Sequence, residues 1–425
     1  MESAQTGTAA AAAGRCPFPV GLRPGRDPLQ EAAEIRQLGV CPMVTLPGGL
    51  KVRAVVDQSL ARRLLTSKLI SRDARRHWPG YREGIIDVDA ITDNWVGTEN
   101  ALNSYGPEHR RFRAPIAEAL SRKRVSEMVP VIEEVVAGLL DRIDGREAVD
   151  AVEAFATQVP LLVTTRLLGI ESQRRAAFRN AIGGLFDTGA SAAEAAGHQA
   201  TVGALLQELI ERKRAVPGDD LTSDFIREVD LADSGLSDQQ LHDQLKLFIA
   251  AGIETTVHGI GTLLVNLMTH PEQLRLLLTR EATWEEACEE SLRYRGPIGA
   301  VPMRFVVSDF TDAESKQDFT RGEPVLVFFG AAGRDVAAHG ASADDFDITR
   351  RQSPHLAFGA GPHFCPGASL ARQEIAMAVA SWFERFPHCS LAVDPSDLQF
   401  LPSWILNGYV QIPTRLRTEA AFHTA

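Results

Sequence analysis

Cys365 lies in a loop whose composition suits metal ligation. Residues 358–367 contain three glycines, two prolines and two phenylalanines, and an apolar helical pattern begins at Leu370. Free backbone N–H groups and the helix dipole at such a position favour a thiolate over a thiol. The glycines allow the backbone to approach a large flat group. The pattern predicts a thiolate ligand for a soft or borderline metal, of which haem iron is one; the plainer alternative is a buried structural cysteine.

A second candidate lies inside the apolar helical pattern that starts with a capping-box sequence at Ser237 and ends before Pro271. Its centre, residues 250–256, reads Ala-Ala-Gly-Ile-Glu-Thr-Thr. Small residues, β-branching and hydroxyls that bond to preceding carbonyls weaken a helix here. Such a local conflict often marks a functional site. The plainer alternative is a kinked core helix in which Glu254 is solvated.

Three basic side chains are candidates for binding an anionic group. His109 and Arg113 are four residues apart, so they share one face of a predicted helix, and such a pair can bind carboxylates or phosphates. The plainer alternative is a solvated, basic helix start. Arg304 interrupts the apolar strand pattern of residues 300–307, and a buried arginine needs an anionic partner.

Glu290 and Arg293 are three residues apart in a further helical segment, so they can pair side by side. Most pairs of this kind are surface salt bridges that contribute little to stability. Spacing alone therefore does not identify this pair as functional.

The composition narrows the class of protein. The chain has 425 residues and a formal net charge of −11, which argues against nucleic acid and anionic membranes as partners. We find no apolar run of membrane-spanning length. Residues 1–18 read as a disordered leader, and residues 19–425 as a single domain. The five cysteines are scattered and odd in number, which indicates reduced thiols and a cytoplasmic location.

The predicted elements form a mostly helical chain with small sheets. A hairpin is expected around Pro47-Gly48-Gly49. The remaining expectations are a helix followed by an irregular loop over 58–100, helices over 116–143 and 151–215 with a glycine-marked break near 183–190, and strands over 300–307 and 324–329.

Four motifs, in this order along the chain, resemble the cytochrome P-450 (haem-thiolate monooxygenase) superfamily of the soluble actinomycete type. Residues 109–113 are similar to its His-x-x-x-Arg motif, 250–256 to its central-helix motif, 290–293 to its Glu-x-x-Arg motif, and 358–367 to its haem-ligand loop. The resemblance implies a mainly α fold with small β-sheets. Haem b (iron protoporphyrin IX) would lie between a long central helix and the helix that follows the cysteine loop.

The resemblance also implies roles for individual residues. Cys365 would be the metal ligand, Glu254 and Thr255 would deliver protons, and Gly252 would leave room for dioxygen. The implied cofactor-binding residues are His109, Arg113, Ala251, Gly252, Arg304, Phe358, His363, Cys365 and Gly367. Glu290, Arg293 and Arg350 would be structural, and a largely apolar substrate pocket would include Phe248, Ile298, Val301, Met303, Trp404 and Ile405.

The activity implied is hydroxylation of a largely apolar small molecule by a monomeric enzyme that receives electrons from a ferredoxin and its reductase. Macrolides, steroids and cyclic dipeptides are the expected substrate classes, because the related actinomycete branch acts on them. One alternative is oxidative radical coupling of substrates at the same haem. Another is a catalytically silent haem-binding scaffold, although that alternative predicts the loss of Cys365, Thr255 or Glu290, and all three are present.

Overall fold

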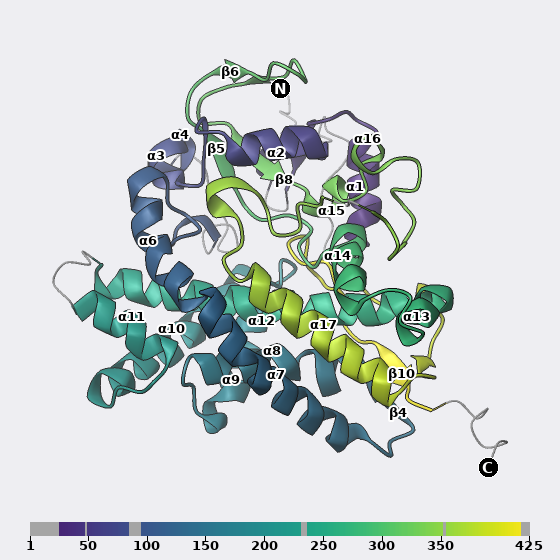
Figure 1. Cartoon of the computed structure of the whole chain (residues 1–425). Helices are drawn as coiled ribbons and strands as arrows, with labels where there is room; N and C mark the ends of the chain where they lie inside the picture. Colours follow the sequence, from purple (N-terminus) through teal and green to yellow (C-terminus); the bar gives the residue numbers. More distant parts are fainter. Residues whose placement is uncertain (1–24, 47–48, 85–94, 231–235, 352–353, 418–425) are drawn as a thin grey trace, which may run out of the picture.

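Helix α12 (Asp238–Thr269) crosses the middle of the molecule, behind α17 in the view of Figure 1. The Ser237 and Gln240 side chains form the expected capping box at its start, and Pro271 follows its end. Most of α12 is buried. The sequence-based statement that no apolar segment reaches membrane-spanning length was wrong: α12 is long and apolar enough, but 72% of its most apolar stretch is buried inside the protein. A buried core helix has this same composition, because it needs no polar face.

The computed structural model describes residues 25–46, 49–84, 95–230, 236–351 and 354–417. The predicted leader, residues 1–18, lies outside the described residues. The longer helices are α1 (Pro28–Arg36), α2 (Gln58–Thr66), α6 (Gly106–Ala119), α7 (Arg122–Ile143), α8 (Gln158–Leu167), α9 (Arg175–Gly184), α10 (Ala192–Ala215), α11 (Leu221–Asp230), α13 (Pro271–Leu278), α14 (Trp284–Arg295) and α17 (Ala368–Arg385). Short helices are α3 (Ala74–His77), α4 (Pro79–Arg82), η1 (Val152–Ala156), η2 (Ser172–Arg174), α15 (Phe329–Ala332), α16 (Val336–His339), η3 (Gly361–His363) and η4 (Pro395–Asp397).

Helix α17 packs against α12, α7 and α14, and this layer connects the cysteine loop to the core. Its buried face carries Trp382 and Phe383, neither of which has exposed surface. The Trp382 ring lies 5.0 Å from that of Phe155. Burial of such large rings contributes much of the packing free energy of a core, so α17 provides a rigid base for the loop that precedes it.

Small sheets flank the helical body, as predicted for a mainly α fold. A five-stranded sheet has the order β1-β2-β8-β5-β3, and a three-stranded sheet has the order β4-β10-β9. The strands are β1 (Met43–Thr45), β2 (Lys51–Val55), β3 (Ile70–Ser71), β4 (Ala148–Asp150), β5 (Arg304–Val306), β6 (Phe310–Thr311), β7 (Asp318–Phe319), β8 (Pro324–Val327), β9 (Ser390–Leu391) and β10 (Pro413–Arg415). The predicted hairpin is confirmed, because Val44 faces Val52 in the antiparallel pair β1–β2.

Residues 58–84 contain more regular structure than predicted for this region. After α2 the chain forms β3, which pairs with β5, and then α3 and α4. The pairing of Ile70 with Val306 joins segments far apart in the sequence. Local sequence patterns cannot reveal a strand of this kind, because its hydrogen-bond partners come from the tertiary fold.

Candidate active site around Cys365

The cysteine loop is closed by backbone hydrogen bonds and by glycines in the left-handed region. The Cys365 N–H donates to the carbonyl of Phe358 at 2.9 Å. Gly361 has φ +70°, and a Cβ on it would lie 2.5 Å from the Leu65 carbonyl oxygen. This glycine therefore allows the loop to pack closely against α2. The sequence had predicted only that the glycines allow the backbone to approach a large flat group.

The Cys365 thiol has a pKa above its ordinary value. Desolvation raises this pKa, and the N–H of Gly367 together with Arg113 and Arg372 lowers it by less. The N–H group at the helix start thus favours the thiolate, as the sequence argument expected, but desolvation outweighs it in the protein alone. A bound metal ion would supply the missing stabilisation, since a coordinating thiol is deprotonated. Within the described ranges, no three His, Cys, Asp or Glu side chains cluster as metal ligands, so Cys365 suits a metal that brings its other ligands with it.

A charged network supports Phe358 at the start of this loop. The Arg372 guanidinium lies over the Phe358 ring, 4.4 Å from its centroid, and donates to Glu289 at 2.5 and 3.1 Å. His355 Nε2 lies 3.1 Å from the same carboxylate. Burial raises the pKa of Glu289, but the bonds from His355 and Arg372 outweigh it and hold this pKa at about 2. Glu289, His355 and Arg372 were not identified from the sequence, since they lie in three separate segments.

The predicted anion-binding residues converge beside the cysteine loop. His109 and His363 have ring centroids 4.1 Å apart, and Arg113 on the same face of α6 donates to the carbonyl of Phe364. Burial, Arg113 and Arg110 lower the pKa of His109 to about 4. Burial lowers the pKa of Arg304 to about 10. Burial, followed by Arg72, His109, Arg304 and Arg113, also lowers the pKa of His363.

Arg72 joins this cluster, which the sequence did not indicate. It is 2% exposed and donates to the carbonyls of Leu102 and Pro302 at 2.7 and 2.6 Å. Burial and the Arg304 charge lower its pKa. Its partners come from a loop and from the segment before β5, so no sequence spacing could have identified it.

The cluster has the properties of a site for a dianionic group. Arg304 Nη1 and His109 Nε2 are buried, and neither has a hydrogen-bond partner among the described residues. Unpartnered buried donors are costly, and gathering cationic side chains at one place raises the cost further. Two carboxylates of the kind that haem carries would accept hydrogen bonds from the unpartnered donors and would neutralise the clustered positive charge. The residues present therefore fit the haem that the sequence motifs imply.

The centre of α12 has a side-chain hydrogen bond to its own backbone and an exposed face. Thr255 Oγ1 donates to the carbonyl of Ala251 at 2.6 Å, and Ala251 is exposed in a helix that is otherwise largely buried. A Cβ on Gly252 would lie 3.4 Å from Thr164 Oγ1 of α8, which is an ordinary van der Waals distance. The packing of α12 on α8 therefore does not require this glycine, and its expected role in leaving room for dioxygen stays a prediction; Ala251 presents the accessible surface.

The buried pair Glu290–Arg293 supports the segment that leads to the cysteine loop. Arg293 donates to Glu290 at 2.8 and 2.7 Å, and it is fully buried. It also donates to the carbonyls of Gly333, Ala343 and Asp345. Arg350 Nε lies 3.5 Å from Glu290 Oε1. The geometry is that of a structural clamp, because Arg293 binds three backbone carbonyls and its side-chain partner Glu290, and none of these is a reacting group.

The predicted pocket residues are only partly brought together. Met303 and Ile405 have no exposed surface and lie in the hydrophobic core. Phe248 lies against Phe225 of α11, with ring centroids 6.3 Å apart. Ile298 forms a β-bridge to Leu406, and Val301 packs beside the sheet. The Trp404 N–H donates to Thr188 Oγ1 at 3.1 Å, so the C-terminal turn is joined to the segment after α9.

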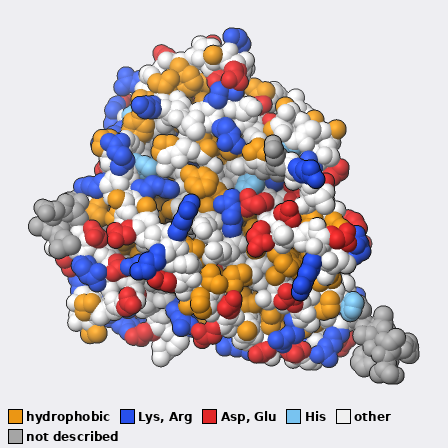
Figure 2. Space-filling view, in the orientation of Figure 1, with side chains coloured by type: hydrophobic (Ala, Val, Ile, Leu, Met, Phe, Trp, Pro, Cys, Tyr) orange, Lys and Arg blue, Asp and Glu red, His pale blue; other side chains and the backbone are white. Residues whose placement is uncertain are grey.

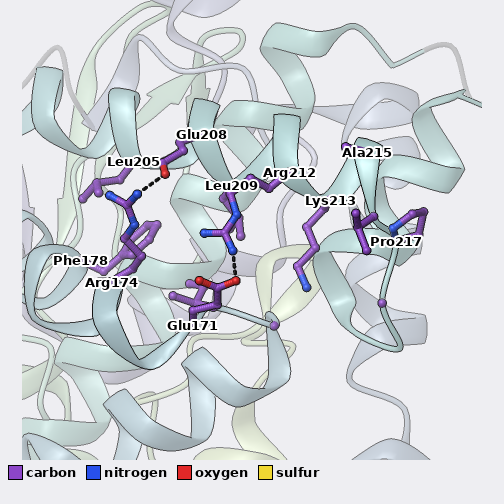
Figure 3. Close-up of a pocket in the computed structure, with 14 residues that line it drawn as sticks. Glu171, Arg174, Phe178, Leu205, Glu208, Leu209, Arg212, Lys213, Ala215 and Pro217 are labelled. Carbon is purple, nitrogen blue, oxygen red and sulfur yellow. Dashed lines mark hydrogen bonds and ion pairs between the residues drawn. The ribbon is translucent and has the colours of Figure 1, made fainter.

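A hollow of about 460 Å³ lies between α9 and α10 and is separate from the site around Cys365 (Figure 3). Its walls come from residues 169–218, and none belongs to α12 or to the cysteine loop. Arg174 pairs with Glu208 and Arg212 pairs with Glu171 across it. Because these charges satisfy one another, the hollow lacks the unpartnered groups found beside Cys365.

Known proteins resemble this chain in sequence and in fold. The family described as Cytochrome P450 matches residues 185–277 and 284–407. The chain is 32% identical to the 2-hydroxy-5-methyl-1-naphthoate 7-hydroxylase of Streptomyces carzinostaticus, over 96% of this chain and 99% of that protein. The structure of CYP154A1 from Streptomyces coelicolor A3(2) is similar, with a TM-score of 0.89 and 39% identity over 94% of this chain and 100% of that one. The P450 enzyme CxnD, described for C–S bond formation in chuangxinmycin biosynthesis, has a TM-score of 0.84 and 29% identity over 93% and 97%.

Proposed function

The chain belongs to the cytochrome P450 family, and we propose that residues 19–425 form one catalytic domain that hydroxylates a largely apolar small molecule of bacterial secondary metabolism. The observation that carries this proposal is the convergence of Cys365 with a cluster made of the buried His109 and Arg304 and the partly exposed Arg113 and His363. The relative that hydroxylates a naphthoate supports the reaction type. The free cysteines among the described residues accord with a reducing, cytoplasmic location.

Haem b would be held by this chain's own residues in three ways. Cys365 would bind the iron, with the Gly367 N–H directed at its sulfur. The two histidines and the arginines would bind the propionates. Phe358, which begins the loop and is held by Arg372, would pack near the Cys365 sulfur. When bound in this way, a haem-thiolate activates dioxygen, and the thiolate favours O–O cleavage.

The remaining work of the protein is to exclude water and to deliver protons. The Thr255 hydroxyl lies on the accessible face of α12, and the neighbouring Glu254 carboxylate can hold a proton for transfer through water. No direct hydrogen bond joins these two side chains in the described structure, so we propose that a water molecule lies between them. An apolar pocket wall would keep the substrate over the site.

The electrons would come from a ferredoxin and its reductase. Figure 2 shows Lys and Arg side chains around hydrophobic ones on the face where α17 and α7 lie in Figure 1. A hollow of about 620 Å³ beside the cysteine loop is lined by Arg62, Arg63 and Phe364, among others, and Phe364 is 42% exposed. A small acidic protein complements such a face, and the monomeric chain leaves it accessible.

Substitution of Cys365 tests the assignment. Cys365→Ser should abolish the reduced carbon-monoxide spectrum typical of thiolate ligation and the activity with it. An unchanged spectrum would overturn the assignment. Titration of the ferric wild-type protein with macrolides, steroids, cyclic dipeptides and naphthoates should then identify the substrate class by its spin-state shift.

Oxidative coupling is the second candidate activity. It is favoured by one observation, the structural similarity to the C–S bond-forming enzyme CxnD. Product analysis in ¹⁸O₂ separates the two activities, since hydroxylation incorporates the label and coupling does not. Retention of Cys365, Thr255 and Glu290 argues against the silent scaffold.

A further inference from the structure

His258 lies one helical turn after Glu254 on α12 and is 4% exposed. Its Nε2 lies 3.5 Å from Oε2 of Glu254, slightly beyond a normal hydrogen bond. The same Nε2 has no hydrogen-bond partner among the described residues. A buried imidazole nitrogen without a partner lowers the stability of the fold unless it forms a hydrogen bond to the adjacent carboxylate.

The His258 ring is held in place from the C-terminal turn. A Cβ on Gly408 would lie 2.4 Å from His258 Nδ1 and 2.5 Å from Cγ. The backbone of Gly408 is itself fixed, because its carbonyl accepts a hydrogen bond from the Leu401 N–H at 3.1 Å. The ring therefore cannot move toward this turn, and its Nε2 edge stays directed at Glu254.

The Glu254 carboxylate has different surroundings on its two oxygens. Oε2 faces His258. Oε1 lies near Gly183 of α9, where a Cβ would be 3.7 Å away. Gly183 has no side chain, so it offers Oε1 no hydrogen-bonding group. One oxygen can thus be anchored while the other remains free for proton transfer.

We propose that His258 positions Glu254 for proton delivery, through an N–H at Nε2 that anchors Oε2 and leaves Oε1 free to bond a water leading to Thr255. This inference rests on the proposed function, because it assumes that Glu254 and Thr255 supply protons. No net transfer from the imidazole is required: His258 keeps its proton and fixes the geometry of the carboxylate. Without it, the carboxylate can rotate away on its flexible side chain.

Matched variants test this role in the holoprotein, without substrate and with a plant-type ferredoxin and reductase as electron source. The measured quantity is the fraction of NADPH electrons that leave as hydrogen peroxide instead of water. His258→Leu should raise this fraction at least twofold and increase the solvent deuterium isotope effect on NADPH oxidation. His258→Gln retains an N–H near the Nε2 position, so it should restore most of the wild-type ratio.

A double-mutant cycle separates positioning from simple structural damage. In a Glu254→Gln background, His258→Leu should have no further effect, because the group it positions is already absent. Thermal midpoint and reduced carbon-monoxide spectrum should stay unchanged in all variants, and a crystal structure of His258→Leu should show the Glu254 carboxylate rotated.

Four outcomes decide whether the positioning role and the proton route hold. Wild-type ratios in both His258 variants would overturn the proposal, and so would equal effects of His258→Leu in both backgrounds. If Thr255→Ala raises peroxide while the His258 variants do not, the proposed function stands and the positioning role fails. If Thr255→Ala and Glu254→Gln also leave the ratio unchanged, the proposed proton route itself fails.

Discussion

At the scale of single residues, the site is defined by charges that lack partners. Among the described residues, the buried Arg293 is paired with Glu290, and the partly buried Arg295 is paired with Asp27. Arg304 and His109 differ from these, because each has a buried nitrogen with no partner in the described structure. A protein tolerates such groups where a ligand completes them.

Arg304 should therefore be important for cofactor retention. We expect Arg304→Met to weaken haem affinity about ten- to a hundredfold, the range for losing one hydrogen bond to a charged group. Transfer of haem to apomyoglobin measures the dissociation rate. Arg110→Ala is the matched control, because Arg110 is exposed on the neighbouring helix. Equal rates in Arg304→Met and the control would contradict the propionate role.

His339 should make the protein less stable in acid. Burial, with Arg293 and Arg350 nearby, lowers its pKa from 6.5 to about 4. The unfolded chain therefore takes up this proton first as the pH falls, so stability is lost between pH 6.5 and 4. We expect His339 to account for a loss of about 2 kcal/mol in unfolding free energy between pH 7.5 and 5.

Urea unfolding at these two pH values measures this contribution. His339→Gln should be less sensitive to pH than the wild type. His388→Gln, at an exposed position, should keep the full wild-type sensitivity. The same pH dependence in His339→Gln and the wild type would show that other groups cause the acid loss.

At the scale of elements, three structures hold the site. Helix α17 supports the cysteine loop from below, and α12 presents Ala251 and Thr255. The third is the coil after α15, which Arg293 binds through three backbone carbonyls. These contacts connect α14 to the chain leading to Cys365. Loss of the clamp should therefore displace the cysteine loop, although the clamp residues themselves are not part of the site.

Glu290→Gln should destabilise the protein by about 3–5 kcal/mol, because it leaves the buried Arg293 charge uncompensated. Thermal unfolding and soluble yield measure the effect. Glu285→Gln makes the same chemical change at an exposed position of α14 and should be neutral. If Glu290→Gln does not fold, Arg350→Met provides a milder test, since its 3.5 Å contact is weaker. A wild-type midpoint in Arg350→Met together with normal yield of Glu290→Gln would contradict the clamp.

At the scale of the whole molecule, the local charge beside the cysteine loop differs in sign from the net charge. The chain carries −11 overall, yet Arg62 and Arg63 line the hollow beside the cysteine loop, and Figure 2 shows Lys and Arg side chains among Asp and Glu ones on the face that it presents. A local field of this kind steers an acidic partner even when the total charge repels it. Because dissolved salt screens this attraction, the association with an acidic redox partner should weaken as the salt concentration rises.

Arg62→Glu should slow reduction by a ferredoxin about tenfold at low salt, because it reverses an exposed charge beside the hollow. Stopped-flow reduction under carbon monoxide measures the rate. The difference from wild type should shrink as ionic strength rises. Arg146→Glu, an exposed reversal near the end of α7, should have little effect; an equal loss in both variants would show that only net charge matters.

The motifs around Cys365, Glu254 and Glu290 were visible in the sequence, because each depends on spacing within one element or one loop. The capping box of α12 and the β1–β2 hairpin were visible for the same reason. The tertiary structure alone revealed Arg72, the Glu289–His355–Arg372 network and the Gly408 contact with His258. It also showed that burial outweighs the helix-start N–H in setting the pKa of Cys365, since desolvation depends on what packs around a group. Spacing along the chain determines which side chains share a face, whereas burial and partners from distant segments are decided only when the chain folds.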